Sequence, residues 1–170
     1  MVTTLDAVRS AVAAVVDPEL PTLTIDDLGI LRSVEIVDGA VEVTITPTYL
    51  ACPALATITD DIRAALSALG HPDARVRTRL SPPWTTAWIT DAGRAKLTAA
   101  GVAPPRSLPI LGASTAYRTG LPPRSHDDPV ACPLCGSTRT TELSPFGATA
   151  CQALWRCEEC REPFTHVKPH

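Results

Sequence analysis

Apolar residues recur at helical spacing in two stretches of this chain. The first is residues 5–16, and Asp17-Pro18 ends it because the residue before a proline disfavours the helical conformation. The second is residues 55–69, and Gly70 suits the position just after a last helical turn. The apolar positions that define the two faces are Leu5, Val8, Val12, Val15 and Val16, then Leu55, Ile58, Ile62, Leu66 and Leu69.

A second pattern, typical of strands, lies between and after these stretches. Residues 30–37 and 41–46 are rich in β-branched residues, and Asp38-Gly39 between them is a typical two-residue hairpin turn. The second of these runs alternates apolar and polar residues, which predicts one buried face. Residues 74–80 predict a third strand.

The order of these elements predicts an α+β fold. A short helix over residues 90–100, with Thr90 as its N-cap, completes the series α-β-β-α-β-α. Amphipathic helices in such a series bury their apolar stripes on one face of a small sheet. We therefore expect residues 1–102 to form one α+β domain.

Prolines mark the end of this domain. Residues 103–129 hold many of the chain's 17 prolines, together with glycine, serine and threonine, and little in this stretch is periodic. Such a composition predicts an extended linker. Residues 130–170 then form a second, smaller module.

Composition narrows the class of protein. The chain has 170 residues, a net charge of −3 and 45% hydrophobic residues, which suits one ordinary domain with a small appendage. So small a charge, without a block of lysine or arginine, argues against nucleic acid as a partner. The start lacks a signal-peptide pattern, and no apolar run reaches the ~18 residues of a membrane span. We expect a cytoplasmic protein with no membrane partner, whose cysteines bind metal or react rather than form disulfides.

Four cysteines near the end of the chain form two pairs, Cys132-Pro-Leu-Cys135 and Cys157-Glu-Glu-Cys160. A two-residue gap lets both thiolates of a pair reach one ion from a tight turn, and two such turns complete a tetrahedron. Gly136 follows the first pair, where such a turn favours a positive φ. The spacing predicts a metal site in a zinc-ribbon-like β module, although thiolate ligands suit zinc and iron alike.

The other cysteine of this module and the histidines give weaker signals. Cys151 is either a spare ligand or a small buried residue, and burial is favoured because four thiolates already saturate a tetrahedral ion. The histidines fall in turn, linker or tail contexts and none has ligand spacing to another, so none is assigned a role. They are His71, His126, His166 and His170.

Cys52 stands apart from the other cysteines. It follows the second predicted strand, and Pro53 after it suits the first turn of the second helix. The helix dipole and the free amides of a helix start favour a thiolate, which can bind a metal or attack an electrophile. The alternative is a small residue that fills a gap between strand and helix.

Two further segments carry candidate chemistry. Acidic residues surround the proline-rich turn 17–21, and they offer oxygen ligands or acid–base groups, or else are ordinary turn and surface residues. In the loop 82–88, Trp84 either covers a site or closes the core. No Gly-rich phosphate loop or Ser/His/Asp arrangement is present, so no self-contained enzyme active site is expected. The acidic residues are Asp17, Glu19, Asp26 and Asp27.

Several of these stretches together resemble known families. Residues 17–29 and 46–53, which contain Asp-Pro-Glu-Leu-Pro and Thr-Tyr-Leu-Ala-Cys-Pro, are similar to the small domain of SufT-like iron–sulfur assembly proteins. Other stretches resemble the PaaD family, accessory proteins of the phenylacetyl-CoA monooxygenase (epoxidase) system. They are residues 83–90, 101–105, 146–151, 154–157 and 161–164. The resemblance covers nearly the whole chain except the linker.

The resemblance implies a maturation factor rather than an enzyme. Family members are associated with assembly of the oxygenase's metal centres, an iron–sulfur cluster in its reductase and a di-iron site in its hydroxylase. These subunits and the iron–sulfur assembly machinery are the implied partners. Cys52 falls on the family's signature cysteine and becomes a transient iron or cluster ligand, with Asp17, Glu19 and Thr85 around it. The C-terminal module becomes a structural zinc ribbon that docks the client.

Two departures from the family pattern affect this site. Many members have a Ser-Gly pair before the signature cysteine, where this chain has Leu50-Ala51, so the backbone there is expected to differ. Many members also have aspartate where this chain has Ala87. If that carboxylate handles metal in the family, this chain lacks it.

Two alternatives belong to other classes of protein. The stretch Cys132–Gly136 also resembles a rubredoxin knuckle, which suggests electron transfer by a bound iron. Against this, Arg161 rather than glycine follows the second pair. The other alternative is a permanent structural subunit of the oxygenase.

Overall fold

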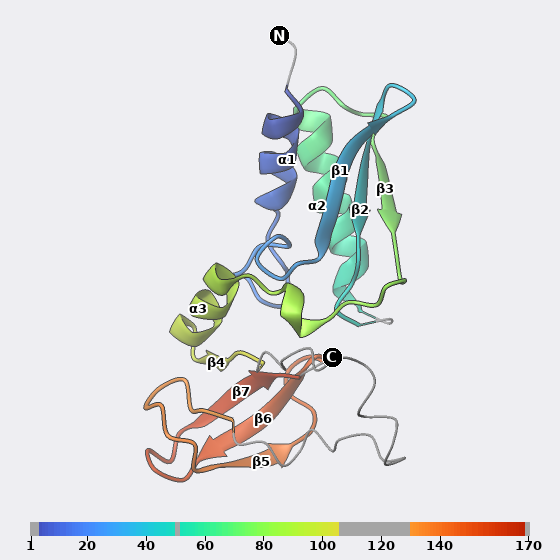
Figure 1. Cartoon of the computed structure of the whole chain (residues 1–170). Coiled ribbons are helices and arrows are strands. Elements are labelled where there is room, and N and C mark those ends of the chain that lie inside the picture. The colour runs from blue at the N-terminus through green and yellow to red at the C-terminus, as the bar shows by residue number, and fades with distance from the viewer. Residues whose placement is uncertain (1–3, 50–51, 106–129, 169–170) are drawn as a thin grey trace, which may run out of the picture. The chain divides into compact units, whose positions relative to one another are not determined.

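The computed structural model describes residues 4–49, 52–105 and 130–168 (Figure 1). The chain divides into two compact units, one that reaches to Ala100 and one that begins at Gly101. No helix in the described ranges is long and apolar enough to cross a membrane.

In its described residues the first unit contains three helices and three strands in the predicted order α-β-β-α-β-α, with one short 3₁₀ helix in the loop before the last helix. They are α1 (Leu5–Ala13), β1 (Leu31–Val37), β2 (Ala40–Ile45), α2 (Ala54–Ala68), β3 (Arg75–Thr78), η1 (Thr86–Trp88) and α3 (Asp91–Ala99). The sheet has the order β1-β2-β3.

The hairpin β1–β2 is antiparallel, and α2 connects β2 to the parallel strand β3. The predicted turn joins the hairpin, with φ of 51° at Asp38 and 79° at Gly39, the left-handed conformation that a two-residue turn requires. Figure 1 shows α1 and α2 together on one side of the sheet, with β3 at its edge. Their apolar stripes and the inward face of β2, including Val43 and Ile45, form the buried core.

Helix α1 ends at Ala13, earlier than the apolar pattern predicts. Val15 and Val16 continue the helical spacing, but their backbone forms other bonds. The Val15 carbonyl accepts the Ile25 N–H at 2.9 Å, and Val16 forms an isolated bridge with Thr24. Pairing with Thr24 and Ile25, in the turn region that follows, therefore replaces the last helical turn.

The second unit is a four-stranded sheet of order β4-β7-β6-β5. Its strands are β4 (Val102–Ala103), β5 (Thr140–Ser144), β6 (Gln152–Cys157) and β7 (Pro163–Val167). β5, β6 and β7 are successive antiparallel strands, whereas β4 pairs in parallel with β7. Ala103, the first residue of the expected linker, thus lies in a strand of this sheet, and residues 106–129 lie outside the described ranges.

His166 differs from its expected tail context. It lies in β7, is 7% exposed, and meets Trp155 edge-to-face with ring centroids 5.8 Å apart. Burial lowers the pKa of His166 to about 4, so the ring is neutral at physiological pH. The residue contributes to the packing of the second unit.

Candidate functional site

The four paired cysteines converge at one point. Their sulfurs all lie within 4.8 Å of one another, with Sγ–Sγ distances of 3.8 Å for Cys132 and Cys160 and 3.6 Å for Cys135 and Cys157. Zinc–sulfur bonds of about 2.3 Å in a tetrahedron require sulfur separations of about 3.8 Å. The thiols are free of disulfides, so the donor set fits a single tetrahedral ion.

Without a cation, a thiolate at one of these cysteines disfavours ionisation of the neighbouring thiols. The backbone N–H of Cys160 stabilises a thiolate at Cys157 and lowers the pKa of that thiol to about 7. At Cys160 a backbone hydrogen bond from Glu162 acts in the same direction, but burial and the three neighbouring sulfurs raise the pKa to about 12. A divalent cation among the sulfurs would relieve this repulsion.

Both knuckle turns adopt the left-handed backbone. Gly136 has φ of 75° after the first pair, and Arg161 has φ of 65° at the matching position after the second. Arginine therefore accepts a conformation that normally costs a non-glycine residue about 1 kcal/mol. The absence of glycine in the second pair does not change the shape of the turn.

Cys151 lies outside this group of sulfurs. Its side chain is half-buried, and its Sγ is 3.1 Å from Thr149 Oγ1. Cys151 is therefore outside the ligand group, as the favoured interpretation expects, but it is half-buried rather than buried.

Cys52 precedes the first turn of α2. Its N–H donates to the Tyr49 carbonyl at 3.1 Å, and its own carbonyl accepts the Leu55 N–H at 3.2 Å. Pro53 occupies the N-cap position of α2 and makes no side-chain hydrogen bond to the helix. The half-buried Cys52 thiol therefore lies next to the start of a helix, where backbone N–H groups favour an anionic group. Leu50 and Ala51, which depart from the family pattern, lie outside the described residues.

A hollow of about 410 Å³ opens beside the loop that leads to Cys52. The loops that follow the parallel strands β2 and β3 both line it, which is the usual place for a binding site in a parallel pair. Its largest apolar surfaces come from Tyr49, Leu80 and Trp84, of which Tyr49 is 44% and Leu80 51% exposed. The remaining lining residues are Thr46, Pro47, Thr48 and Pro83.

Asp17 begins the acidic turn and is 6% exposed. Its Oδ1 accepts the Glu19 N–H at 2.9 Å and the Leu20 N–H at 2.8 Å. Burial raises the pKa of Asp17 even though both backbone hydrogen bonds act to lower it. Asp17 therefore shapes the turn, and half-buried Glu19 follows within it.

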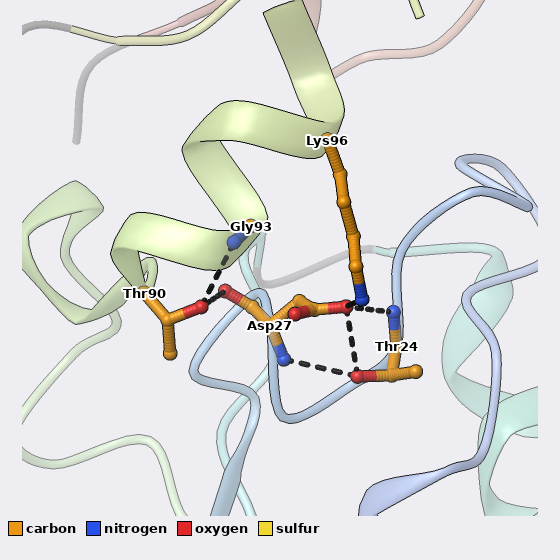
Figure 2. Close-up of polar contacts among 5 residues, drawn as sticks. All are labelled: Thr24, Asp27, Thr90, Gly93 and Lys96. Atoms are coloured by element: carbon orange, nitrogen blue, oxygen red, sulfur yellow. Dashed lines mark hydrogen bonds and ion pairs between the residues drawn. The ribbon is translucent and has the colours of Figure 1, made fainter. Parts of the chain in front are cut away.

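Asp27 is the centre of a polar network that joins the acidic turn region to α3 (Figure 2). Its Oδ2 accepts from Lys96 Nζ at 2.6 Å and from the N–H and hydroxyl of Thr24 at 2.9 and 3.1 Å. Burial opposes ionisation of this carboxyl, but the bonds from Lys96 and Thr24 outweigh it and lower the pKa of Asp27.

The backbone of α3 also contacts this turn closely. The Thr90 N–H donates to the Asp27 carbonyl at 2.9 Å, and the Thr90 hydroxyl caps the helix by accepting the Gly93 N–H at 2.9 Å. A Cβ at Gly93 would lie 2.6 Å from the Asp27 carbonyl oxygen, so only glycine permits this approach.

The tryptophan loop packs against the same turn. Trp84 is 5% exposed and its Nε1 donates to the Leu28 carbonyl at 2.8 Å, so it closes the core while one side lines the hollow. The Arg32 guanidinium lies 3.5 Å from the centroid of the Trp88 ring. Thr85 caps η1 by accepting the Ala87 N–H at 3.0 Å.

The structure therefore gathers some of the predicted residues and not others. Among the described residues, the four paired cysteines are the one group of three or more Cys, His, Asp or Glu ligands close enough to hold an ion. Asp17 and Glu19 do not form such a group with Cys52. Sequence reasoning missed the bond between Asp27 and Lys96, because 69 positions separate them and no local pattern connects them.

Comparison with known proteins matches part of each unit to a family profile. Residues 5–77 match the profile described as "Iron-sulfur cluster assembly protein", and residues 119–168 match "PaaD zinc beta ribbon domain". Over 152 residues the chain is 41% identical to a putative 1,2-phenylacetyl-CoA epoxidase subunit from Escherichia coli K12, covering 89% of this chain and 85% of the relative. The chain belongs to the PaaD family.

Two further proteins are similar to part of this PaaD family member. The "Fe-S protein maturation auxiliary factor YitW" of Bacillus subtilis is 36% identical over 80 residues, 46% of this chain and 78% of the relative. A domain of unknown function, DUF59, from Bacillus anthracis has a solved structure with 26% identity and a TM-score of 0.49. That match covers 54% of this chain and 89% of the other. The segment 78–105, which contains α3, lies beyond both family profiles.

Proposed function

We propose that this PaaD family member is an accessory factor that helps assemble iron–sulfur or di-iron centres of a phenylacetyl-CoA oxygenase, rather than an enzyme. The observation that carries the proposal is that one chain matches both an iron–sulfur cluster assembly profile and a PaaD zinc ribbon profile. A relative that spans 89% of the chain is named as a putative epoxidase subunit. The partners are then the oxygenase reductase or hydroxylase and the iron–sulfur assembly machinery, in the cytoplasm.

Cys52 is the proposed transient ligand or transfer thiol. The open start of α2 offers amides that stabilise an anionic sulfur or a sulfur-bound cluster, and the half-buried position limits access by solvent. Asp17, Glu19 and Thr85 are proposed as supporting residues. Asp17 and Thr85 do so by fixing the backbone of their turns, as their hydrogen bonds indicate.

In the second unit, zinc is the proposed structural ion, held by Cys132, Cys135, Cys157 and Cys160. Four protein ligands leave no open coordination position, so such an ion supports folding rather than chemistry. The ribbon is then the module that docks the client.

Expression of the oxygenase together with Cys52→Ala tests the transfer role. We expect the iron content of the purified oxygenase to fall severalfold, because the thiol that passes iron or cluster is gone. Cys151→Ala is the matched control, since Cys151 is also half-buried and is not one of the four clustered cysteines. An oxygenase that fills normally with a folded Cys52→Ala partner would show that Cys52 has no essential transfer role.

A rubredoxin-like electron carrier is the second candidate, favoured by the matching left-handed turns after both cysteine pairs. Metal analysis and the visible spectrum of the purified protein distinguish the two functions. A colourless protein with stoichiometric zinc supports the structural ion, whereas a coloured protein with stoichiometric iron supports the carrier. Stable co-purification with the hydroxylase would instead indicate a permanent subunit.

A further inference from the structure

The exposed edge of the first sheet carries a row of arginines that the proposed function does not use. Strand β3 is the last strand in the order β1-β2-β3, so one of its sides has no strand partner among the described residues. Arg75, Arg77 and Arg79 alternate along this strand and its exit, and all three are exposed. The chain as a whole carries a net charge of −3, so this edge is locally opposite in sign to the protein.

Two of these arginines are unused within the described structure. Arg77 pairs through Nε with Glu42 Oε2 at 2.7 Å, whereas the side chains of Arg75 and Arg79 make no hydrogen bond, ion pair or ring contact with a described residue. Other basic side chains of the first unit have partners. Arg9 pairs with Asp26, Arg32 stacks on Trp88, Arg63 pairs with Asp60, Arg94 donates to the Thr86 carbonyl, and Lys96 pairs with Asp27.

The backbone of β3 is also available for pairing. The Arg79 N–H donates to the Ile45 carbonyl at 2.8 Å, which fixes the direction in which alternate peptide groups point. Alternation along a parallel strand then directs the N–H and C=O groups of Val76 and Thr78 away from β2, toward the unpaired edge.

Arginine on an edge strand also guards against unwanted pairing between copies, so the charges alone do not define a site. The hollow next to the end of β3 favours a binding role for this edge over a role that only prevents pairing between copies. β3 is followed by Leu80 and Pro83, both of which line the hollow beside the loop that leads to Cys52. One extended chain along β3 can therefore place acidic side chains near the arginines and an apolar side chain in the hollow.

We propose that β3 and the hollow bind an extended, acidic polypeptide segment with a bulky apolar residue at one end. This deepens the proposed function, on which it rests, since such a segment of the client would be aligned next to Cys52. The partner is a polypeptide because edge peptide groups, cations and an apolar hollow all belong to β3 and the residues that follow it, whereas a membrane or nucleic acid would use the cations alone.

A labelled peptide of alternating glutamate and valine, ending in phenylalanine, tests this site by fluorescence anisotropy on the full zinc-loaded chain. The double variant Arg75→Glu/Arg79→Glu is expected to bind at least about tenfold more weakly than wild type, because two attractions become repulsions. Arg75→Gln/Arg79→Gln should give a smaller loss in the same direction. The matched control is Arg156→Glu, an exposed strand arginine of the other unit, which should bind as wild type does.

Two further measurements separate this mode from simple charge attraction. Amide exchange by NMR should slow at Val76 and Thr78 when the peptide binds, and Leu80→Glu should weaken only the peptide that contains phenylalanine. Equal binding by the charge-reversed variant, no protection at these amides, preference for phosphatidylserine vesicles, or peptide-free dimerisation through β3 would each overturn the proposal.

Cys52→Ala distinguishes this proposal from the transfer role. The variant should bind the peptide with unchanged affinity, because the binding edge does not include the thiol. If Cys52→Ala leaves oxygenase maturation intact while Arg75→Glu/Arg79→Glu still abolishes peptide binding, the transfer role fails and the docking edge stands. If the charge-reversed variant binds normally, the docking edge fails whatever the outcome for Cys52.

Discussion

Two aspartates of one acidic segment show how the surroundings of a residue decide its role. Asp17 and Asp27 are 6% and 7% exposed, and both accept backbone N–H groups. Asp27 also binds the Lys96 ammonium, and its pKa falls. Asp17 accepts from two backbone N–H groups of its own turn, which do not offset its burial, and its pKa rises. The same side chain is therefore a stabilised anion in one place and a destabilised anion in the other.

We expect the fold to tolerate Asp17→Asn but to be destabilised by Asp17→Ala. The amide oxygen of an asparagine at this position would keep both N–H donors bonded without a buried charge, so Asp17→Asn should match or exceed wild-type stability at neutral pH. Asp17→Ala removes the acceptor of one buried and one half-buried N–H and should cost about 1–3 kcal/mol of unfolding free energy. Urea unfolding followed by circular dichroism measures both changes.

The pH dependence of Asp17 has a definite sign. The folded-state pKa of Asp17 is raised above its unfolded value of 3.8, so ionisation of this carboxyl lowers the free energy of unfolding as pH rises above 3.8. Over that range the free energy of unfolding should therefore rise less in the wild type than in Asp17→Asn. A wild type that is clearly more stable than Asp17→Asn at neutral pH would contradict the interpretation. Loss of oxygenase maturation in a stable Asp17→Asn variant would instead assign chemistry to the carboxylate.

At the scale of elements, α3 is held by a turn rather than by the sheet. The Asp27 carboxylate and carbonyl both bind this helix, one through Lys96 and the other through Thr90 at the helix start (Figure 2). Gly93 lets the helix backbone approach the turn. Since Trp84 binds the Leu28 carbonyl of the same turn, α3 and one wall of the hollow depend on one local structure.

Lys96→Met should weaken this attachment. Removing the ammonium leaves the buried Asp27 carboxylate without its cation. We expect a loss of about 1–2 kcal/mol in unfolding free energy, because half-exposed Lys96 is partly screened. The loss should be present above pH 3.8 and should disappear as acid protonates Asp27, whose folded-state pKa is lowered.

Arg63→Met is the control for Lys96→Met. It removes a cation from an exposed pair with Asp60 on α2, where the two side chains are 57% and 76% exposed, so stability should change little. Equal effects of the two variants, measured by urea unfolding, would mean that the pair in Figure 2 contributes no more than a surface pair.

Local patterns in the sequence were sufficient to predict the helices and strands but not the contacts that hold these elements together. The hairpin turn at Asp38-Gly39, the start of α3 at Thr90 and the end of α2 before Gly70 depend on neighbouring residues, and they were predictable. The early end of α1 was not, because the backbone pairing of Val16 with Thr24 leaves no sign in the apolar pattern. The four-cysteine site was predictable because the spacing of the two pairs alone implies two metal-binding turns. The hollow beside the loop that leads to Cys52 was not predictable, because it forms only when the loops after two strands meet in the folded chain.

At the scale of the whole molecule, the two units use different means of stabilisation. The first has a core of aliphatic side chains from α1, α2 and the sheet. The second has a smaller cluster that includes Cys132 and Cys157, two of the paired cysteines, beside Trp155 and Phe164. The metal ligands are thus part of the second core itself.

Removal of metal should therefore unfold the second unit and spare the first. After chelation, or in Cys132→Ser, we expect the NMR amide signals of β5, β6 and β7 to lose their dispersion because the ion closes a small core. Signals of α1, α2 and β1–β3 should keep their positions. Dispersed β6 and β7 signals in the metal-free protein would show that the ion is not structural.

The parallel pairing of β4 with β7 has a consequence for the time at which the protein matures in the cell. Val102 pairs with Thr165 and Ala103 with His166, so the sheet of the second unit joins residues from the middle of the chain to residues near its end. A ribosome that has made the whole first unit has not yet made Cys157, Cys160 or β7. The first unit can fold during translation, while the second can complete its sheet and close around its ion only after β7 has emerged.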